Sequence, residues 1–184
     1  MRIAIFGGTF DPIHSAHLVV AAEAACQFHL DQILFIPNAV PPHKTGRTPF
    51  DHRLRMVQLA CAGYPQFAVS DIEQANEKSY SILTLERLLP TGGEWFFLIG
   101  ADAFAEIATW HRWTEVVALV TFIVVSRPGS TYAIPDGARV LPLETVELDV
   151  SSTRIRADLA RGEMPDELPP AVAEYIRAER LYGF

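Results

Sequence analysis

Two kinds of hydrophobic pattern alternate along this chain. Short runs of consecutive apolar residues are typical of strands buried on both faces, and apolar residues spaced three or four apart are typical of helices. The runs predict strands at 3–6, 33–36, 67–69, 95–99, 122–125, 139–141 and 146–150. The spacing predicts helices at 17–25, 49–61, 80–89, 113–119 and 152–161 and a last helix from 170 onward, with Thr48 and Ser151 as N-caps.

The alternation of strands and helices predicts an α/β fold, a doubly wound parallel sheet with helices on both of its faces. The polar stretches at 37–49, 127–137 and 162–170 contain Pro or Gly and are short enough to be loops, so we expect a single domain over residues 1–184. In doubly wound sheets, ligands bind beyond the carboxyl ends of the strands. Residues that directly follow a strand are therefore the candidates for a functional site.

Composition narrows the choice of partner and compartment. The 184 residues include 15 Lys and Arg against 22 Asp and Glu, a net charge of −7, and 49% of them are apolar. This balance excludes a disordered chain and argues against a nucleic acid polymer or an anionic membrane as partner. Two cysteines cannot build a disulfide framework or a four-thiolate zinc site, so we expect a reducing, cytoplasmic location. The longest apolar-rich run, 116–125, is shorter than the ~20 residues of a membrane span.

The segment Gly7–His17, GGTFDPIHSAH, joins the first expected strand to the first expected helix. Glycines let the backbone approach an anion closely, and a helix N-terminus offers free N–H groups and partial positive charge. His14 and His17 can share one face of that helix, as hydrogen-bond donors or as cations for a polyphosphate. The segment lacks the G-x-G-x-x-G fingerprint of redox dinucleotide sites, and no third zinc ligand lies nearby. A tight turn with two surface histidines is the remaining alternative.

A second candidate phosphate site is Val150–Arg156, VSSTRIR, which follows an expected strand and begins a helix. The hydroxyls of Ser151 and Ser152 and the N–H groups of the helix start can bind phosphate. Arg156 adds a cation that can bind phosphate through two hydrogen bonds. A Ser-capped helix with solvated arginines explains the same residues equally well.

Other polar and aromatic residues follow strands or begin helices in the middle of the chain. Lysine suits a monophosphate, and a helix start with hydroxyls suits a carboxylate. A carboxylate after a strand suits ribose hydroxyls, and tryptophan can stack on a flat ring. These candidates are Asn38, His43, Lys44, Ser81, Thr84, Gly100, Asp102, Trp110 and Arg127, with Trp113 as the alternative stacking residue. Several of them have an ordinary alternative as loop, cap or core residues.

The segment Gly7–His17 resembles the signature G-x-F-D-x-x-H-x-x-H of the nucleotidylyltransferase superfamily, whose members share a Rossmann-like fold. Val150–Arg156 is similar to that superfamily's I-S-S-T-x-I-R, and Ala16 stands where many members have glycine. The chain also contains P-P-H-K at 41–44, S-Y-x-x-x-T-L at 79–85, G-A-D at 100–102, T-W-H-x-W at 109–113 and S-R-P at 126–128. With these motifs it resembles bacterial nicotinate-nucleotide adenylyltransferases over essentially its whole length.

The resemblance implies adenylyl transfer from ATP to nicotinate mononucleotide, a step of NAD biosynthesis that gives deamido-NAD and pyrophosphate without a covalent intermediate. It also implies Mg²⁺ that is bound mainly through the ATP phosphates. The implied catalytic residues are His14, His17 and Arg156. The implied ATP-binding residues are Gly7, Gly8, Thr9, Phe10, Gly100, Asp102, Ser151 and Ser152. The implied acceptor-binding residues are Asn38, His43, Lys44, Ser81, Thr84, Trp110 and Arg127.

Another nucleotidylyltransferase activity and a function without catalysis stay open at this point. Pantetheine-phosphate adenylyltransferases have a similar first signature, although Ser81, Thr84 and Trp110 argue against that acceptor. A non-catalytic nucleotide-binding module would share the fold, although such a module has no need of both histidines and Arg156. The sequence leaves a homo-oligomer open. It predicts that the cationic residues of the motifs gather at the sheet end while the acidic excess lies elsewhere.

Overall fold

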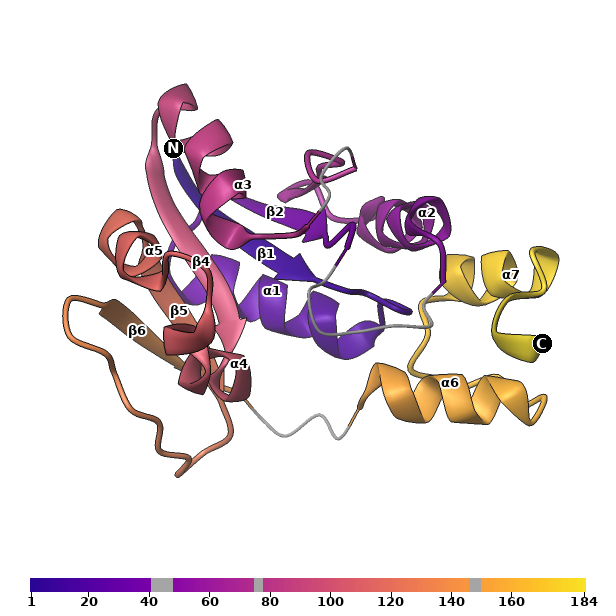
Figure 1. Cartoon of the computed structure of the whole chain (residues 1–184). Coiled ribbons are helices and arrows are strands. Elements are labelled where there is room, and N and C mark those ends of the chain that lie inside the picture. The colour runs from indigo at the N-terminus through magenta and orange to yellow at the C-terminus, as the bar shows by residue number, and fades with distance from the viewer. Residues whose placement is uncertain (41–47, 75–77, 146–149) are drawn as a thin grey trace.

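Strands β1 to β6 form one parallel sheet in the order β3-β2-β1-β4-β5-β6 (Figure 1). The computed structural model describes residues 1–40, 48–74, 78–145 and 150–184. The strands are β1 (Arg2–Gly8), β2 (Gln32–Pro37), β3 (Phe67–Val69), β4 (Glu94–Gly100), β5 (Thr121–Ser126) and β6 (Arg139–Glu144). The α-helices are α1 (Ser15–Gln27), α2 (Phe50–Cys61), α3 (Ser81–Leu88), α4 (Ala101–Ala105), α5 (Trp113–Leu119), α6 (Ser152–Ala160) and α7 (Pro170–Ala178). The 3-10 helices are η1 (Leu89–Thr91), η2 (Ile107–Thr109) and η3 (Leu181–Gly183).

The strand order reverses between β1 and β4. Strand β1 pairs with β2 on one side, where Gly8 lies opposite Pro37, and with β4 on the other side, where Ala4 lies opposite Phe96. The chain runs outward from β1 to β3 and then returns to place β4 beside β1. Such a reversal opens a crevice at the carboxyl ends of the two central strands, because their connections leave in opposite directions. The fold thus places the residues after β1 and β4 where a ligand can bind.

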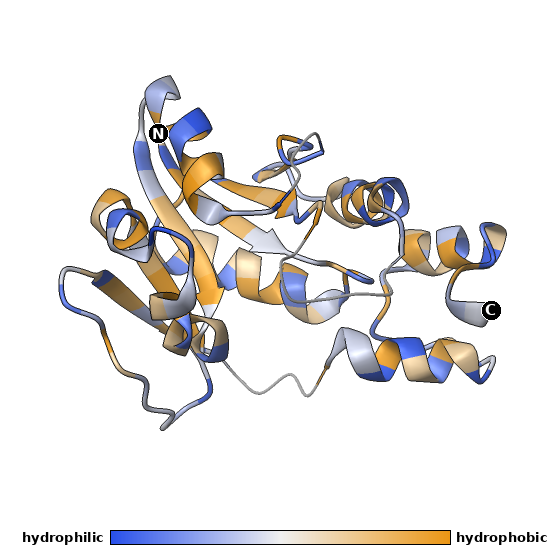
Figure 2. Cartoon of the chain, viewed as in Figure 1, coloured by the Kyte–Doolittle hydropathy of each residue, from blue (hydrophilic) through white to orange (hydrophobic). Residues whose placement is uncertain are grey.

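The sheet carries a hydrophobic core on each face. Along β4, Phe96 and Leu98 pack into one cluster with residues of α1, α2, α6 and α7, and Phe97 and Ile99 pack into another with residues of α3, α4 and α5. Successive residues of a strand point to opposite faces, which is why a strand buried on both sides is continuously apolar in sequence. Figure 2 shows central strands that are largely apolar between helices of mixed character. The prediction of a parallel sheet with helices on both faces is confirmed.

Most expected elements are present, with a few differences. Helix α2 has Pro49 at its N-cap, so the prediction of Thr48 as the cap is wrong; the Thr48 carbonyl accepts a hydrogen bond from Arg53 instead, at 2.9 Å. Residues 146–149 of the last expected strand lie outside the described residues, and Val150 is not in a strand. The pattern missed α4 because five residues are too few to show a helical period. Within the described ranges, no helix combines the length and the apolar character that a bilayer crossing requires.

Arg53 of α2 is fully buried, with 2% of its surface exposed. Its guanidinium donates hydrogen bonds to the backbone carbonyls of Thr9 (2.8 Å), Asn38 (2.8 Å), Ala39 (3.2 Å) and Thr48 (2.9 Å). Burial lowers the pKa of Arg53, and the charge of Asp11 acts in the opposite direction. The guanidinium still carries its charge at neutral pH, since arginine is the most basic of the side chains. One buried cation therefore ties the loops after β1 and β2 to the start of α2.

We expect the substitution Arg53→Met to lower the free energy of unfolding by about 3–5 kcal/mol, because it leaves buried carbonyls unsatisfied and removes the cation near Asp11. The matched control is Arg55→Met, since Arg55 lies on the same helix and is exposed. Its loss should change stability by less than about 0.5 kcal/mol. Urea unfolding followed by circular dichroism measures both variants. Equal stability of the two would contradict the role given to Arg53.

Candidate active site

Two clefts open at the carboxyl ends of the strands. The first has a volume of about 610 Å³ and lies among α1, the end of β4, the start of α4 and the segment after β5. The second has a volume of about 550 Å³ and lies among the ends of β1 and β2, the start of α3, and the segment from α4 through η2. Both volumes are within the range of small-molecule sites. The end of β4 contributes to both, through Gly100 in the first cleft and Ile99 in the second.

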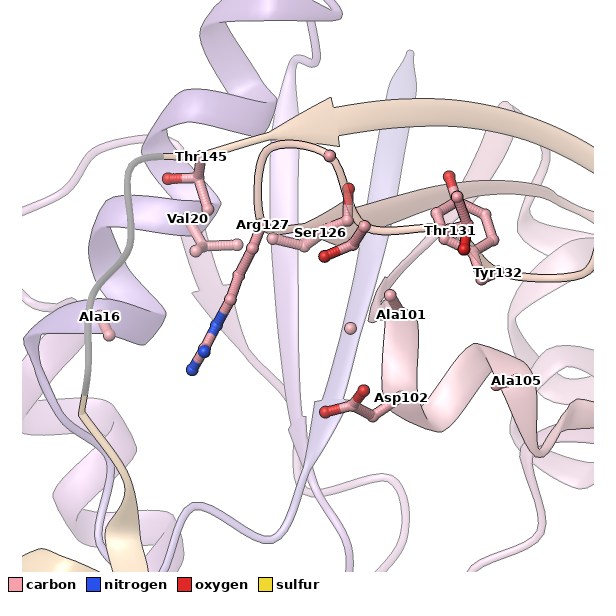
Figure 3. A pocket seen from close by; sticks show the side chains of 14 residues that line it. Ala16, Val20, Ala101, Asp102, Ala105, Ser126, Arg127, Thr131, Tyr132 and Thr145 are labelled. Atoms are coloured by element: carbon pink, nitrogen blue, oxygen red, sulfur yellow. The ribbon is translucent and has the colours of Figure 1, made fainter.

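The first cleft combines a cation and an acid. Figure 3 shows the Arg127 side chain reaching into it from the segment after β5, and the Asp102 carboxylate entering from the first turn of α4. Ala16 and Val20 of α1 line another wall. A carboxylate accepts hydrogen bonds from hydroxyl groups, and a guanidinium donates them to phosphate oxygens. The cleft can therefore hold a ligand that carries both hydroxyls and phosphate.

The second cleft has aromatic walls. Trp110 meets Phe97 edge to face, with ring centroids 5.8 Å apart, and the ring of Tyr80 lies against that of His111 at 4.6 Å. Ser81, the first residue of α3, also lines this cleft, so free N–H groups of a helix start face it together with a hydroxyl. Flat walls beside hydrogen-bond donors suit a planar ring that bears an anionic group.

His14 and His17 lie together at the start of α1, with ring centroids 3.8 Å apart. The backbone N–H of His14 donates to Nδ1 of His17 at 3.2 Å, so a neutral His17 ring carries its proton on Nε2. Burial lowers the pKa of His14 to about 4. Burial, and then repulsion from His14, holds the pKa of His17 well below its usual range. Both rings are therefore neutral at pH 7 in the free protein. Of the two forms that the sequence left open, hydrogen-bond donor or cation, only the donor form is available to them.

The two sequence motifs are hydrogen-bonded to each other. Ser152 Oγ donates to the carbonyl of Pro12 at 3.0 Å, and Nη1 of Arg156 donates to the carbonyl of Asp11 at 2.7 Å. The hydroxyl of Ser151 accepts from the backbone of α6 at 3.2 Å, which confirms the prediction that this serine is the N-cap. These bonds bring the N-terminus of α6 beside the loop that precedes α1. Two helix N-termini, whose dipoles favour anions, thus meet near the histidine pair.

The turn after β1 depends on a glycine because of one aromatic ring. A Cβ atom on Gly8 would lie 2.9 Å from Cζ of Phe10, closer than real Cβ contacts come. Phe10 cannot move away easily, since its ring is 2% exposed and packs against Phe6 and Phe35. The resemblance places Phe10 among the ATP-binding residues, but its side chain lies in the core. Only its backbone is available for a ligand.

Half of the implied site residues fall into two groups around the clefts, and His14, His17, Ser151, Ser152 and Arg156 line neither cleft. The second cleft brings together Gly7, Gly8, Thr9, Asn38, Ser81 and Trp110. The first cleft brings together Gly100, Asp102 and Arg127. Both Trp110 and Trp113 pack against the core on the α3–α5 face of the sheet, but of the two only Trp110 lines the second cleft. His43 and Lys44 lie outside the described residues.

Two of the implied acceptor residues are not where the sequence places them. Thr84 is 4% exposed and its hydroxyl donates to Oε1 of Glu73 at 2.7 Å, so it faces the interior and does not line the second cleft. The position on the helix decides this, since Thr84 lies one turn beyond Ser81 on the side that packs against the sheet. Arg127 lines the first cleft with Asp102, apart from Asn38 and Trp110, because β5 lies on the far side of β4 from β1.

Some residues that shape the site were missed from sequence. Tyr80 and His111 line the second cleft, and Arg53 holds the loops that form its rim. Arg53 did leave a signal, since a charged residue occupied an inward position of an amphipathic helix, and arginine is rarely buried without partners. The contact of Tyr80 with His111 left none, because it joins segments that only the fold brings together.

A cytidylyltransferase-like family model matches residues 5–158 of the chain. A probable nicotinate-nucleotide adenylyltransferase from Solibacter usitatus is 53% identical to it over 188 residues, which cover 100% of each chain. The chain belongs to the nicotinate-nucleotide adenylyltransferase family. Another probable family member, from Citrifermentans bemidjiense, is 41% identical over 212 residues, covering 99% of this chain and 98% of its own. Among solved structures, the nicotinic acid mononucleotide adenylyltransferase of Plasmodium falciparum complexed with NaAD gives a TM-score of 0.82 at 22% identity, covering 100% of this chain and 98% of that chain.

Membership in the nicotinate-nucleotide adenylyltransferase family makes the chain a nucleotidyltransferase. The likeness to the Plasmodium falciparum enzyme confirms the Rossmann-like form of the α/β fold. The similarity to the two relatives extends over nearly the whole chain and therefore includes both clefts and both phosphate motifs. Ala16, at the position where the superfamily signature often has glycine, is buried and lines the first cleft, so its methyl group narrows that cleft beside the start of α1.

The lowered pKa of His14 predicts an acid-sensitive fold. Between pH 6.5 and 4 the unfolded chain binds a proton at His14 that the folded chain does not, so stability is complete above about pH 6.5 and falls as the pH falls toward 4. The loss from His14 is about 2 kcal/mol at pH 5. Urea unfolding at pH 7 and pH 5 measures it, and His14→Asn should reduce the difference between the two pH values. The exposed His29 supplies the control: if His29→Asn reduced that difference as much, the assignment to His14 would be wrong.

Proposed function

We propose that this chain transfers the adenylyl group of ATP to nicotinate mononucleotide, giving deamido-NAD and pyrophosphate, as a step of NAD biosynthesis. One observation carries the proposal: a cleft with aromatic walls, lined by the glycine turn after β1, and a cleft with Asp102 and Arg127, lined by the start of α1, open at the same sheet end. The names of the relatives support it. The acidic composition and the two cysteines support a cytoplasmic location.

ATP is assigned to the first cleft and the helix starts beside it. The carboxylate of Asp102 accepts hydrogen bonds from the ribose hydroxyls, and Gly100 leaves room for the nucleoside because it has no side chain. The triphosphate runs across the N-termini of α1 and α6, where free N–H groups favour anions. Ser151, Ser152 and Arg156 hold the β- and γ-phosphates there. Arg127 points into the same cleft, which makes it a ligand for ATP in this proposal rather than for the acceptor.

Nicotinate mononucleotide is assigned to the second cleft. Trp110 stacks on the pyridine ring, and Ser81 with the N–H groups at the start of α3 binds the carboxylate. Asn38 lies toward the turn at Gly8, the side on which the acceptor phosphate must approach ATP. His43 and Lys44 are proposed as phosphate ligands from the sequence alone.

The reaction needs no covalent enzyme intermediate. An oxygen of the acceptor's 5′-phosphate attacks the α-phosphorus of ATP in line, a new P–O bond forms, and the bond between the α-phosphorus and the bridging oxygen breaks to release pyrophosphate. A phosphate monoester is already a nucleophile, so no general base is required. Nε2–H of His17 donates to the reacting phosphate and stabilises the charge that develops there. The two clefts supply the alignment.

The residues present fit Mg²⁺ bound mainly through phosphates and water. No group of three His, Cys, Asp or Glu side chains that could hold a metal occurs among the described residues, and Asp102 supplies a carboxylate at the first cleft. When bound, the ion would neutralise part of the triphosphate charge. The protein's own contribution is the placement of ATP by Asp102, Arg127 and Arg156.

His17→Ala is expected to lower kcat about 10²–10³-fold, because it removes a donor that acts on the charge of the transition state. Pyrophosphate release from ATP and nicotinate mononucleotide measures the rate. The circular dichroism spectrum and the melting temperature should stay close to those of the parent chain. The side chain of His17 is not fully buried, and the substitution removes only one hydrogen bond, from the backbone N–H of His14. Near-normal turnover in the folded variant would overturn the assignment.

The acceptor assignment is tested by comparing nicotinate mononucleotide, nicotinamide mononucleotide and phosphopantetheine in the same assay. The parent chain should use nicotinate mononucleotide best, because the second cleft has aromatic walls for its ring and donors for its carboxylate. Trp110→Ala should raise the KM for this acceptor about tenfold, a typical effect of losing one stacked base, and leave the KM for ATP within about twofold.

Trp113→Ala is the matched control for that substitution. Trp113 packs against the core and lines neither cleft, so its loss should lower the melting temperature without changing either KM. An equal rise of both KM values in the Trp110 variant would mean that Trp110 is a core residue. Preferential use of phosphopantetheine by the parent chain would contradict the proposed function itself.

A further inference from the structure

The C-terminal segment reaches the loop that precedes α1. The hydroxyl of Tyr182, in η3, donates a hydrogen bond of 2.7 Å to Oδ1 of Asp11, across a sequence separation of 171 residues. Figure 1 shows this segment beside α6. Tyr182 is half-buried and lines neither cleft. Its bond to Asp11 has no part in the binding of either substrate described above.

The carboxylate of Asp11 faces the interior. Asp11 is 5% exposed, and its second carboxylate oxygen accepts from the backbone N–H of Thr48 at 3.4 Å. Its carbonyl is the acceptor for the guanidinium of Arg156. Asp11 therefore links three other residues. Tyr182 and Thr48 donate hydrogen bonds to its side chain, and Arg156 donates one to its backbone carbonyl.

The backbone around Tyr182 is in a conformation that tyrosine rarely adopts. Arg180 has φ of 53° and Tyr182 has φ of 63°, both in the left-handed region, and Gly183 follows with φ of 85°. Side chains other than glycine occupy this region at a cost in free energy, so tertiary contacts must hold it. Burial raises the pKa of Tyr182, which keeps the hydroxyl protonated and able to donate. This backbone conformation places the Tyr182 hydroxyl within hydrogen-bond distance of Asp11.

We propose that Tyr182 is a positioning residue for adenylyl transfer, whose hydroxyl holds Asp11 so that the Asp11 carbonyl keeps the Arg156 guanidinium beside the helix starts that receive the triphosphate. The inference rests on the proposed function, in which Arg156 holds the β- and γ-phosphates. Without the hydroxyl, Asp11 loses one of its two side-chain partners and the loop that carries it is less constrained. The second cleft is untouched, so acceptor binding is unaffected.

The test compares Tyr182→Phe with Tyr175→Phe. Tyr175 is also half-buried near the C-terminus, but its hydroxyl is hydrogen-bonded to Nδ1 of His52 at 2.8 Å and not to Asp11. Each substitution removes one hydroxyl and its hydrogen bond, so both should lower the melting temperature by similar amounts. Only Tyr182→Phe should lower kcat, by about tenfold, with the KM for nicotinate mononucleotide within twofold of the parent value.

A third and a fourth variant, Arg156→Lys alone and together with Tyr182→Phe, test whether Tyr182 acts through Arg156. Arg156→Lys should lower kcat, and adding Tyr182→Phe should then change kcat by less than about twofold, because the group that Tyr182 positions is already altered. A full tenfold further loss in the double variant would overturn the inference, as would a Tyr182→Phe enzyme with parent kcat.

A failure of the role given to Tyr182 and a failure of the proposed function would give different results. If Arg156→Lys lowers turnover and Tyr182→Phe does not, only the positioning role of Tyr182 is wrong. If Arg156→Lys leaves the turnover of ATP and nicotinate mononucleotide unchanged, the assignment of the triphosphate is wrong and the positioning role falls with it.

Discussion

The site depends on one buried cation. The guanidinium of Arg53 is out of contact with water and can remain charged only if acceptors surround it. The acceptors are carbonyls of the loop after β1, the loop after β2 and the turn before α2, and the charge of Asp11 lies near. Because carbonyls have fixed positions on the backbone, satisfying Arg53 fixes the paths of these loops. The glycine turn and Asn38 take their places as a result.

A second set of hydrogen bonds joins the C-terminal part of the chain to the loop between β1 and α1. Asp11 and Pro12 offer their carbonyls to Arg156 and Ser152, and the Asp11 carboxylate receives the hydroxyl of Tyr182. The helix starts to which we assign the triphosphate are therefore held in place before any ligand arrives. A reaction that proceeds by alignment and charge stabilisation gains most from such preorganisation, since little reorganisation remains for the moment of transfer.

The predictions from sequence succeeded where the signal was local. The buried strands, the helices on both faces and the Ser151 cap follow from residue spacing within a few turns of chain. Local signals could not place side chains whose neighbours come from other parts of the chain. Thr84 lies in the first turns of α3, where a hydroxyl could bind a ligand, but its hydroxyl donates a hydrogen bond to Glu73 in the interior. Arg127 follows a strand, but the order of strands puts it in the cleft with Asp102.

By itself, the sequence determined the α/β class, the positions of the two phosphate motifs and the family, because apolar periodicity and motif spacing are properties of neighbouring residues. The tertiary structure alone decided that the histidines are neutral, that two clefts open at the sheet end, and that Arg156 and Tyr182 are both hydrogen-bonded to Asp11. Burial and hydrogen-bond partners arise from segments far apart in the chain. Their effect on charge and position exists only once the chain has folded.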